Sequence, residues 1–407
     1  MSSKAYNEQG IFNRLVQDTA RRWGKTGLLS SEQVGSIRQA FPSDFYEPHL
    51  FVKIALFLFT CFAVVTVSGL VFLLLSEGSY SGSQNREGRL LLGCLLSGGG
   101  AIGLLEVLIR SNQLYRSGVD NALLYVALGY FVAVLAFGYS LALPGSLDPE
   151  LLLARGLLGW LLLPGLLLLL AAVVRYADPL VGALSFGLYL TTVAVLLLQF
   201  SSGKALLPFG LMLASAGGYQ LVGLLSRRPD YLYYRTCLRT VKVLALAGFY
   251  LAGNYLVVRE ANALLHGLPS SVQISFAPLF YLFTGALPLL YLYQGLRRHD
   301  RILLHTGLLT LAFSLYTYRF YRAVLPPEVA LALGGAVLIL LAGAAMRYLR
   351  PARYGLTAEP TDQPAFSVPE LESVVMSHVT ETSMQPHEPG FRFGGGSSGG
   401  GGAEGRY

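Results

Sequence analysis

The sequence predicts an all-α membrane protein with about ten transmembrane helices, and two observations lead to this prediction. Ten apolar stretches lie between about residue 50 and residue 347, and roughly 20 apolar residues are enough to cross the hydrocarbon core of a bilayer. The chain of 407 residues is 53% hydrophobic and only 13% charged, whereas about 25% of the residues of a soluble domain are charged. We therefore expect lipid, rather than water, to surround most of the chain.

Residues 1–49 precede the first apolar stretch and predict a small cytosolic helical hairpin. Its first helix is indicated by apolar residues at helical spacing: Ile11, Leu15, Val16, Ala20 and Trp23. Gly24 and Gly27 are expected to end this helix. Ser30 then begins a second helix as its N-cap, with Gln33 as the capping-box partner, and Pro42 stops it.

The ten predicted spans fill a transmembrane domain over residues 50–347. Their predicted ranges are 50–76, 89–110, 120–143, 156–174, 179–200, 205–226, 238–258, 274–295, 301–321 and 327–347. The first apolar stretch begins too late for a secretory signal peptide, so we expect it to remain as a span.

The basic residues predict the orientation of these spans. With the N-terminus inside, 21 of the Lys and Arg residues between Lys4 and Arg353 face the cytosol and only seven face outwards: Arg86, Arg89, Arg155, Lys204, Arg259, Arg319 and Arg322. Because cytosolic loops of membrane proteins carry the excess of basic residues, both termini are predicted to be cytosolic. The expected location is a bacterial inner membrane.

A short pattern recurs in every predicted internal cytosolic loop, where an Arg stands shortly before an Asp. The four copies are Arg116 with Asp120, Arg175 with Asp178, Arg228 with Asp230, and Arg298 with Asp300. Helix capping by Asp, together with the inward bias of Arg, is sufficient to explain the pattern. The alternative is a duplicated helical hairpin, which would make the fold an array of five antiparallel pairs.

Residues 348–407 are predicted to form a disordered cytosolic tail. Several Pro, Glu, Ser and Thr residues are followed by a Gly/Ser run between Gly394 and Gly402. Such a composition cannot bury a hydrophobic core.

The N-terminal module carries a motif that resembles a known family. The residues are Trp23-Gly24-Lys25-Thr26-Gly27-Leu28-Leu29-Ser30-Ser31-Glu32-Gln33-Val34. This stretch, followed by a run of spans, is similar to a family of bacterial membrane proteins, number 2157 in the series of domains of unknown function. The resemblance implies a short cytosolic helical module in front of many membrane helices, and it brings no reaction or substrate.

The end of the chain carries a second resemblance. The run from Phe393 through Gly394–Gly402 to Ala403 looks like the Gly-rich tails of bacterial membrane proteins that have a TPM (thylakoid-type phosphatase-like) domain. Those tails usually end in Trp, whereas this one ends in Arg406-Tyr407. No TPM domain is recognised in the sequence, so phosphatase activity is not implied. The resemblance implies either a shared partner that binds such tails or merely a flexible extension.

Ionisable and polar residues inside predicted spans are the candidates for ligand or ion binding, because such residues are costly in a membrane. The candidates are Glu106, Asn254, His305 and Arg319. Glu106 stands four residues before Arg110, so a local ion pair at the headgroups is the simpler explanation. The alternative is a carboxylate that binds a proton or cation in a polar cavity. For His305 a helix contact is the simpler role, and for Arg319 an aromatic belt at the outer interface.

No recognisable catalytic or metal-binding motif was found in the sequence. The glycine-rich segment 97–103 lacks the Lys and Ser/Thr of a phosphate loop, and Cys61, Cys94 and Cys237 have no metal-ligand spacing. We therefore expect no metal, no cofactor and no enzymatic activity. The net charge of +7 belongs to loops that flank spans, so nucleic acid is not expected as a partner.

Three functions remain open on these observations. The first is a non-enzymatic scaffold or sensor, which recruits a protein partner through the hairpin and the tail. The candidate contact residues for that partner are Trp23, Leu29, Val34, Ile37, Phe393 and Tyr407. The second is a transporter or channel for a small solute or ion, for which Glu106, Asn254 and His305 should converge on one cavity. The third is an enzyme that modifies lipids. The sequence does not indicate an oligomeric state.

Overall fold

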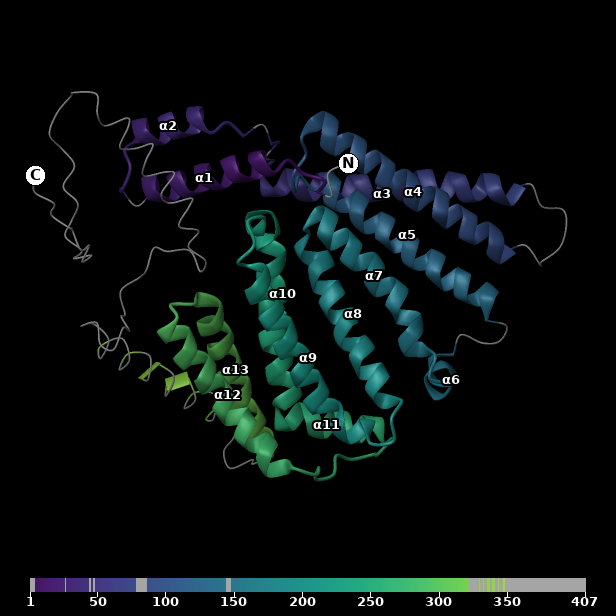
Figure 1. The fold of residues 1–407 in the computed structure, drawn as a ribbon, viewed down its shortest axis with the longest axis vertical. Coiled ribbons are helices and arrows are strands. Elements are labelled where there is room, and N and C mark those ends of the chain that lie inside the picture. The colour runs from purple at the N-terminus through teal and green to yellow at the C-terminus, as the bar shows by residue number, and fades with distance from the viewer. Residues whose placement is uncertain are drawn as a thin grey trace, which may run out of the picture. The chain divides into compact units, whose positions relative to one another are not determined.

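The structure is a computed structural model, and it describes residues 4–25, 27–43, 45–46, 48–77, 86–143 and 148–321, with scattered positions between 329 and 347. All named elements in the described residues are helices (Figure 1). They are α1 (Glu8–Lys25), α2 (Ser31–Ala40), α3 (Leu50–Glu77), α4 (Arg86–Asn112), α5 (Val119–Ala142), α6 (Pro149–Ala154), α7 (Leu158–Tyr176), α8 (Pro179–Leu198), α9 (Gly203–Leu225), α10 (Tyr231–Gly253), α11 (Tyr255–Leu265), α12 (Ala277–Arg297) and α13 (Arg301–Tyr321). The predicted all-α fold is confirmed.

Eight of these helices are long and apolar enough to cross a membrane, namely α3, α4, α5, α7, α8, α9, α10 and α12. The clearest is α3, which has a mean hydropathy of 2.5 over its most apolar stretch, with only 6% of that stretch buried. Its Phe59, Phe62 and Leu74 side chains are largely exposed. Large apolar side chains on such a long helix require a lipid environment, so the protein is a multi-pass membrane protein.

The other two predicted spans have different outcomes. The ninth coincides with α13, which is not among the eight and contains several Thr and Tyr residues and two Arg residues. The tenth, at 327–347, lies for the most part outside the described residues, and the predicted tail lies wholly outside them.

The seventh span was predicted at 238–258, and these boundaries are wrong. The helix begins at Tyr231 and ends at Gly253, and a new helix, α11, starts at Tyr255. The break occurs at Asn254, whose side-chain oxygen accepts hydrogen bonds from the backbone N–H groups of Leu256 and Val257 at 3.0 and 3.3 Å. An apolar sequence continues across this point, but the Asn254 side chain caps a separate helix.

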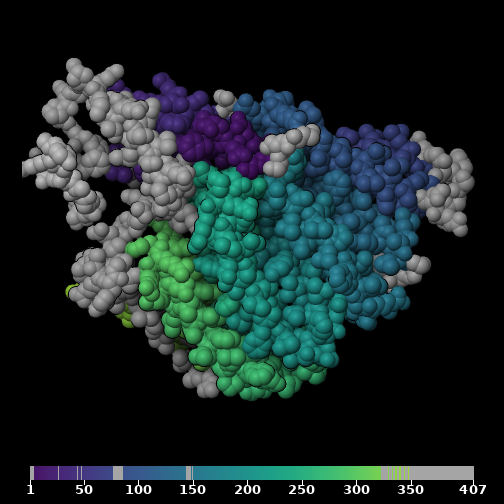
Figure 2. Space-filling view, viewed as in Figure 1, coloured from purple at the N-terminus to yellow at the C-terminus, as the bar shows by residue number. Residues whose placement is uncertain are grey.

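Four pairs of consecutive helices pack against each other as hairpins: α4 with α5, α7 with α8, α9 with α10, and α12 with α13. Figure 2 shows the green surface of α12 and α13 beside a teal surface, and both helices pack against α10. The turns of these four hairpins carry the four Arg…Asp copies. Two of the predicted caps are confirmed, because Asp178 and Asp300 accept from the first backbone N–H groups of α8 and α13.

The described chain falls into two compact units. Residues 4–12 and those from 43 onward belong to a membrane unit, whereas Asn13–Pro42 form a second unit. Helix α1 begins in the first unit and continues in the second. The second unit is therefore narrower than the predicted module of residues 1–49.

The second unit contains the predicted second helix and its capping box. The Ser30 backbone N–H donates to the Gln33 side chain at 2.9 Å, and the Gln33 N–H donates to the Ser30 hydroxyl at 3.2 Å. Gly27 adopts φ +77°, which suits glycine in the turn between the helices. The Gln17 side-chain amide donates to the Phe41 carbonyl at 2.6 Å and so ties α1 to the end of α2.

Candidate functional site

The N-terminal segment Lys4–Asn7 connects three of the four hairpin turns of the membrane unit. The Tyr6 hydroxyl donates to Asp120 at 2.9 Å, at the start of α5. The Ala5 N–H donates to the carbonyl of Arg175, at the end of α7, at 3.0 Å. The Lys4 ammonium lies 3.4 Å from Asp230, just before α10. The helices that meet here are far apart in the sequence, so the segment acts as a clamp across their ends.

Asp120 is the centre of this clamp. It is 1% exposed, and besides Tyr6 it accepts hydrogen bonds from the Arg116 N–H at 2.6 Å, the Ser117 N–H at 2.9 Å and the Ser117 hydroxyl at 3.1 Å. Four donors satisfy a carboxylate that would otherwise be very costly to bury. Arg116, which has a left-handed φ of 53°, extends its guanidinium to the Thr236 hydroxyl on α10 at 3.0 Å. The turn between α4 and α5 is thereby attached to α10 as well.

Two groups of the clamp outside the spans have shifted pKa values. Burial raises the pKa of Tyr6 well above its usual value, and the neighbouring Asp120 carboxylate raises it further. Burial by itself lowers the pKa of Lys4, but Glu8 and Asp230 outweigh it, so that the pKa is raised. Both shifts favour the protonated form, which is the form that makes the contacts of the clamp.

Glu106, the acid predicted from the sequence, lies beside the clamp with a different principal partner from the one expected. The Nε atom of Arg175 is 2.7 Å from Glu106 Oε1, and the Tyr176 hydroxyl donates to the same oxygen at 2.8 Å. Arg110 is 3.8 Å away from the other oxygen and is largely exposed. The carboxylate is thus held by α7 rather than by its own helix.

A cavity of about 600 Å³ lies between Glu106 and the N-terminal segment. Its charged lining residues are Lys4, Glu8, Glu106, Arg110 and Arg175. Positive and negative groups nearly balance, and most of them are already paired with one another. This balance suits a structural junction better than a binding site for a charged solute.

Asn254 lies in a buried polar network at the other end of the membrane unit. It is 0% exposed, and its amide nitrogen donates to the Tyr250 hydroxyl at 2.9 Å and to the Thr317 hydroxyl on α13 at 3.1 Å. Asn254 therefore makes a hydrogen bond between two helices, α10 and α13. Because both atoms of the amide are satisfied, Asn254 fixes the break between α10 and α11.

His305 and Arg319 both lie on α13. His305 is exposed, and its Nδ1 is 2.5 Å from the Arg301 carbonyl of its own helix. Arg319 is half-buried between exposed Tyr318 and Phe320, and the aromatic belt stays a prediction.

Glu106, Asn254 and His305 have separate sets of partners, and the cavity that Glu106 lines is lined by neither of the other two. The convergence expected for a transport site is not seen. Within the same residues, no group of three or more His, Cys, Asp or Glu side chains could hold a metal ion.

The residues proposed for partner binding differ in exposure. Ile37 is fully buried, Leu29 is 7% exposed, and Trp23 and Val34 are half-buried. Phe393 and Tyr407 lie outside the described residues. The exposed positions of the second unit include the charged residues Arg21, Glu32 and Arg38, together with Leu28, which is 47% exposed.

Reasoning from the sequence missed Lys4 and Tyr6, because both stand before the first helix in a short polar stretch. The usable signal was the set of four Asp residues at the hairpin turns, since a buried carboxylate requires donors from elsewhere in the chain. Asp120 accepts a hydrogen bond from the Tyr6 hydroxyl, and Asp178 accepts one from the Tyr125 hydroxyl at 3.0 Å. Asp300 accepts one from the Lys242 ammonium.

Comparison of the chain with models of protein families, with curated proteins and with solved structures gave no match. The resemblances to family 2157 and to the tails of TPM-domain proteins therefore remain predictions.

Proposed function

We propose that the protein is a non-enzymatic scaffold or sensor of the bacterial inner membrane, which recruits a protein partner through its hairpin Asn13–Pro42. The observation that carries this proposal is the clamp formed by Lys4, Ala5 and Tyr6. It fixes the start of α1 on the membrane unit, and the rest of α1 belongs to a separate unit. Such an arrangement suits a module that is held near the membrane for binding rather than for chemistry.

The orientation is part of the same proposal. Both termini are cytosolic, because 21 of the basic residues between Lys4 and Arg353 then face inwards and seven face outwards. A reporter that is active only in the cytosol, fused after residue 407, should be active, and one that is active only in the periplasm should be inactive. The opposite result would contradict a cytosolic C-terminus, and with an even number of spans it would also place the hairpin outside the cytosol.

Photo-crosslinking in cells tests recruitment. A photoreactive amino acid is placed at exposed hairpin positions, Arg21 or Glu32, and, as a matched control, at Arg155, an exposed cation at the opposite end of the membrane unit. We expect the same protein adduct from both hairpin positions and none from Arg155. Deletion of residues 391–407 tests whether the tail contributes to the same adduct. Identical adducts from all three positions, or adducts to lipid alone, would contradict the proposal.

A further inference from the structure

A second cavity lies at the end of the membrane unit opposite to the clamp. Helix α10 starts beside Asp230, the partner of Lys4, and ends at Gly253, next to this cavity. The walls come from the start of α9, from α11 and from the segment that leads into α12. The cavity has a volume of about 450 Å³, which is within the usual range for small-molecule sites.

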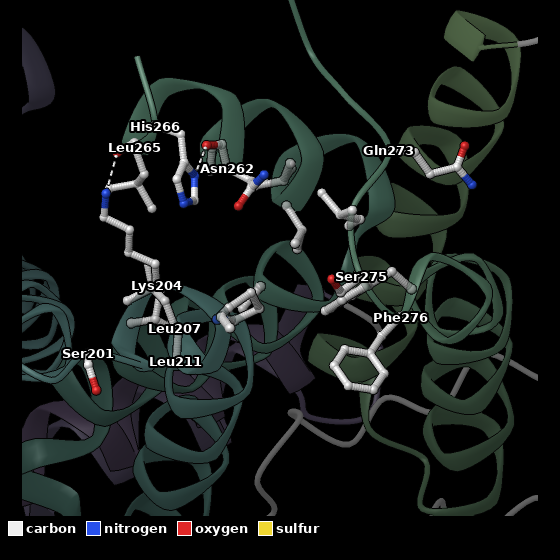
Figure 3. A pocket seen from close by; sticks show the side chains of 18 residues that line it. Ser201, Lys204, Leu207, Leu211, Asn262, Leu265, His266, Gln273, Ser275 and Phe276 are labelled. Carbon is white, nitrogen blue, oxygen red and sulfur yellow. Dashed lines mark hydrogen bonds between the residues drawn. The ribbon is translucent and has the colours of Figure 1, made fainter. Parts of the chain in front are cut away.

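Polar groups stand on the walls of this cavity (Figure 3). The Lys204 side chain runs along one side, and its ammonium donates to the Leu265 carbonyl at 3.0 Å. The Nδ1 of His266 is 2.8 Å from the Asn262 carbonyl, so the ring is held with its other nitrogen towards the cavity. The side-chain amide of Asn262 also points into the cavity.

The described lining of this cavity has a basic side chain and no acidic one. None of the described residues that line it is an Asp or a Glu. Lys204 is therefore bonded to a backbone carbonyl and not neutralised by a carboxylate there. A cation would find no carboxylate among these described lining residues, whereas an anion would find an ammonium and the amide and ring donors of Asn262 and His266.

The deeper lining is apolar and consists of Leu207, Pro208, Leu211, Ala252, Val258 and Phe280. Leu207 and Leu211 are one turn apart on α9 and lie below Lys204 in Figure 3. A small inorganic anion would leave this surface uncovered. A ligand with an apolar chain would cover it, at a gain of about 0.8 kcal/mol for each buried methylene group.

A structural role for Lys204 accounts for only part of this arrangement. A Lys ammonium on the last carbonyls of a helix is a common stabilising contact, and it explains the bond to Leu265. It does not explain why the Asn262 amide and the free His266 nitrogen face the same cavity above an apolar floor.

We propose that this cavity binds an anionic amphiphile, namely a phosphate-bearing membrane lipid. The headgroup is bound by Lys204, Asn262 and His266, and the beginning of the acyl chain lies on Leu207 and Leu211. An ammonium beside neutral hydrogen-bond donors suits the negative charge of such a headgroup. The site is separate from the hairpin, so it does not depend on the proposed recruitment of a partner.

Native mass spectrometry of the full chain in detergent tests the proposal. Phosphatidylglycerol is titrated against the wild type, against Lys204→Met, which keeps the side-chain length but removes the charge, and against Arg155→Gln, which removes an exposed cation near the same end of the unit. We expect the apparent Kd to rise about tenfold for Lys204→Met, as loss of one charge-assisted hydrogen bond implies, and to stay unchanged for Arg155→Gln.

A second variant is needed because Lys204→Met also removes the contact with α11, and the loss of that contact could itself weaken lipid binding. Asn262→Leu keeps that contact and should still raise the Kd several-fold. Phosphatidylcholine should bind much more weakly than phosphatidylglycerol, and inorganic phosphate should not displace the lipid. Unchanged affinity in both variants, equal binding of the two lipids, or displacement by phosphate alone would each overturn the proposal.

Discussion

The substitution Tyr6→Phe should weaken the clamp at the N-terminus by a defined amount. The Tyr6 side chain is 8% exposed, and its hydroxyl lies 2.9 Å from a carboxylate oxygen of Asp120. A hydrogen bond to a charged group contributes about 1.5–3 kcal/mol. Asp120 keeps its other three donors in the variant, so we expect the lower part of this range, about 1.5–2 kcal/mol.

This free energy should appear as easier local opening of the N-terminal segment. Because each 1.4 kcal/mol changes an equilibrium about tenfold, the open state should become about 10–30 times more populated. Hydrogen exchange of the peptide that contains residues 4–12, measured by mass spectrometry in detergent, reports this population. The Ala5 amide is a suitable probe, because it is bonded to the Arg175 carbonyl across the clamp.

The control is Tyr293→Phe, which removes the same hydroxyl from a tyrosine that is 57% exposed on α12. It should leave the exchange of residues 4–12 unchanged, and exchange in α4 should be the same in both variants. An increase of less than about twofold in Tyr6→Phe would refute the reasoning, because the bond to Asp120 would then contribute almost nothing to the clamp.

Three further predictions concern charge, packing and pH. Lys242→Met breaks the buried ion pair with Asp300 and should lower the free energy of unfolding by about 3–5 kcal/mol. In unfolding curves measured in detergent, the addition of Asp300→Asn should restore part of this loss, and no restoration would argue against the pair. Gly203→Ala places a Cβ 1.7 Å from a backbone carbonyl oxygen of α8, whereas Gly217→Ala meets nothing within 4 Å, so only the first should lower the melting temperature. The raised pKa of Tyr6 means that the clamp has its full strength below about pH 10 and loses it at higher pH. The absorbance difference at about 295 nm between wild type and Tyr6→Phe should therefore titrate above about pH 10. A midpoint at about 10 would contradict burial of the phenol.

Some features follow from the sequence because they depend on local physics. The run of apolar residues in 50–76 determines a membrane helix wherever it packs, since the hydrocarbon core sets the required length. The capping box of Ser30 and Gln33 is similarly local, because both hydrogen bonds are made within four residues. The Asp178 cap belongs to the same class.

Other features depend on which distant residues meet, and these were not predictable from one sequence. Glu106 was expected to pair with Arg110, four residues away, but Arg175 on another helix comes closer. Helix α10 was expected to continue to residue 258, yet Asn254 ends it, with Thr317 as a partner 63 residues away.

Length, hydropathy and capping act over a few residues, so the amino-acid order alone predicts a helical membrane protein with a small capped hairpin before its first span. The packing of distant helices was needed to bring Lys4, Ala5 and Tyr6 onto three hairpin turns, and Lys204, Asn262 and His266 around one cavity. A buried polar group is satisfied by whichever donor or acceptor the packed helices bring within about 3 Å, and sequence distance does not restrict that choice.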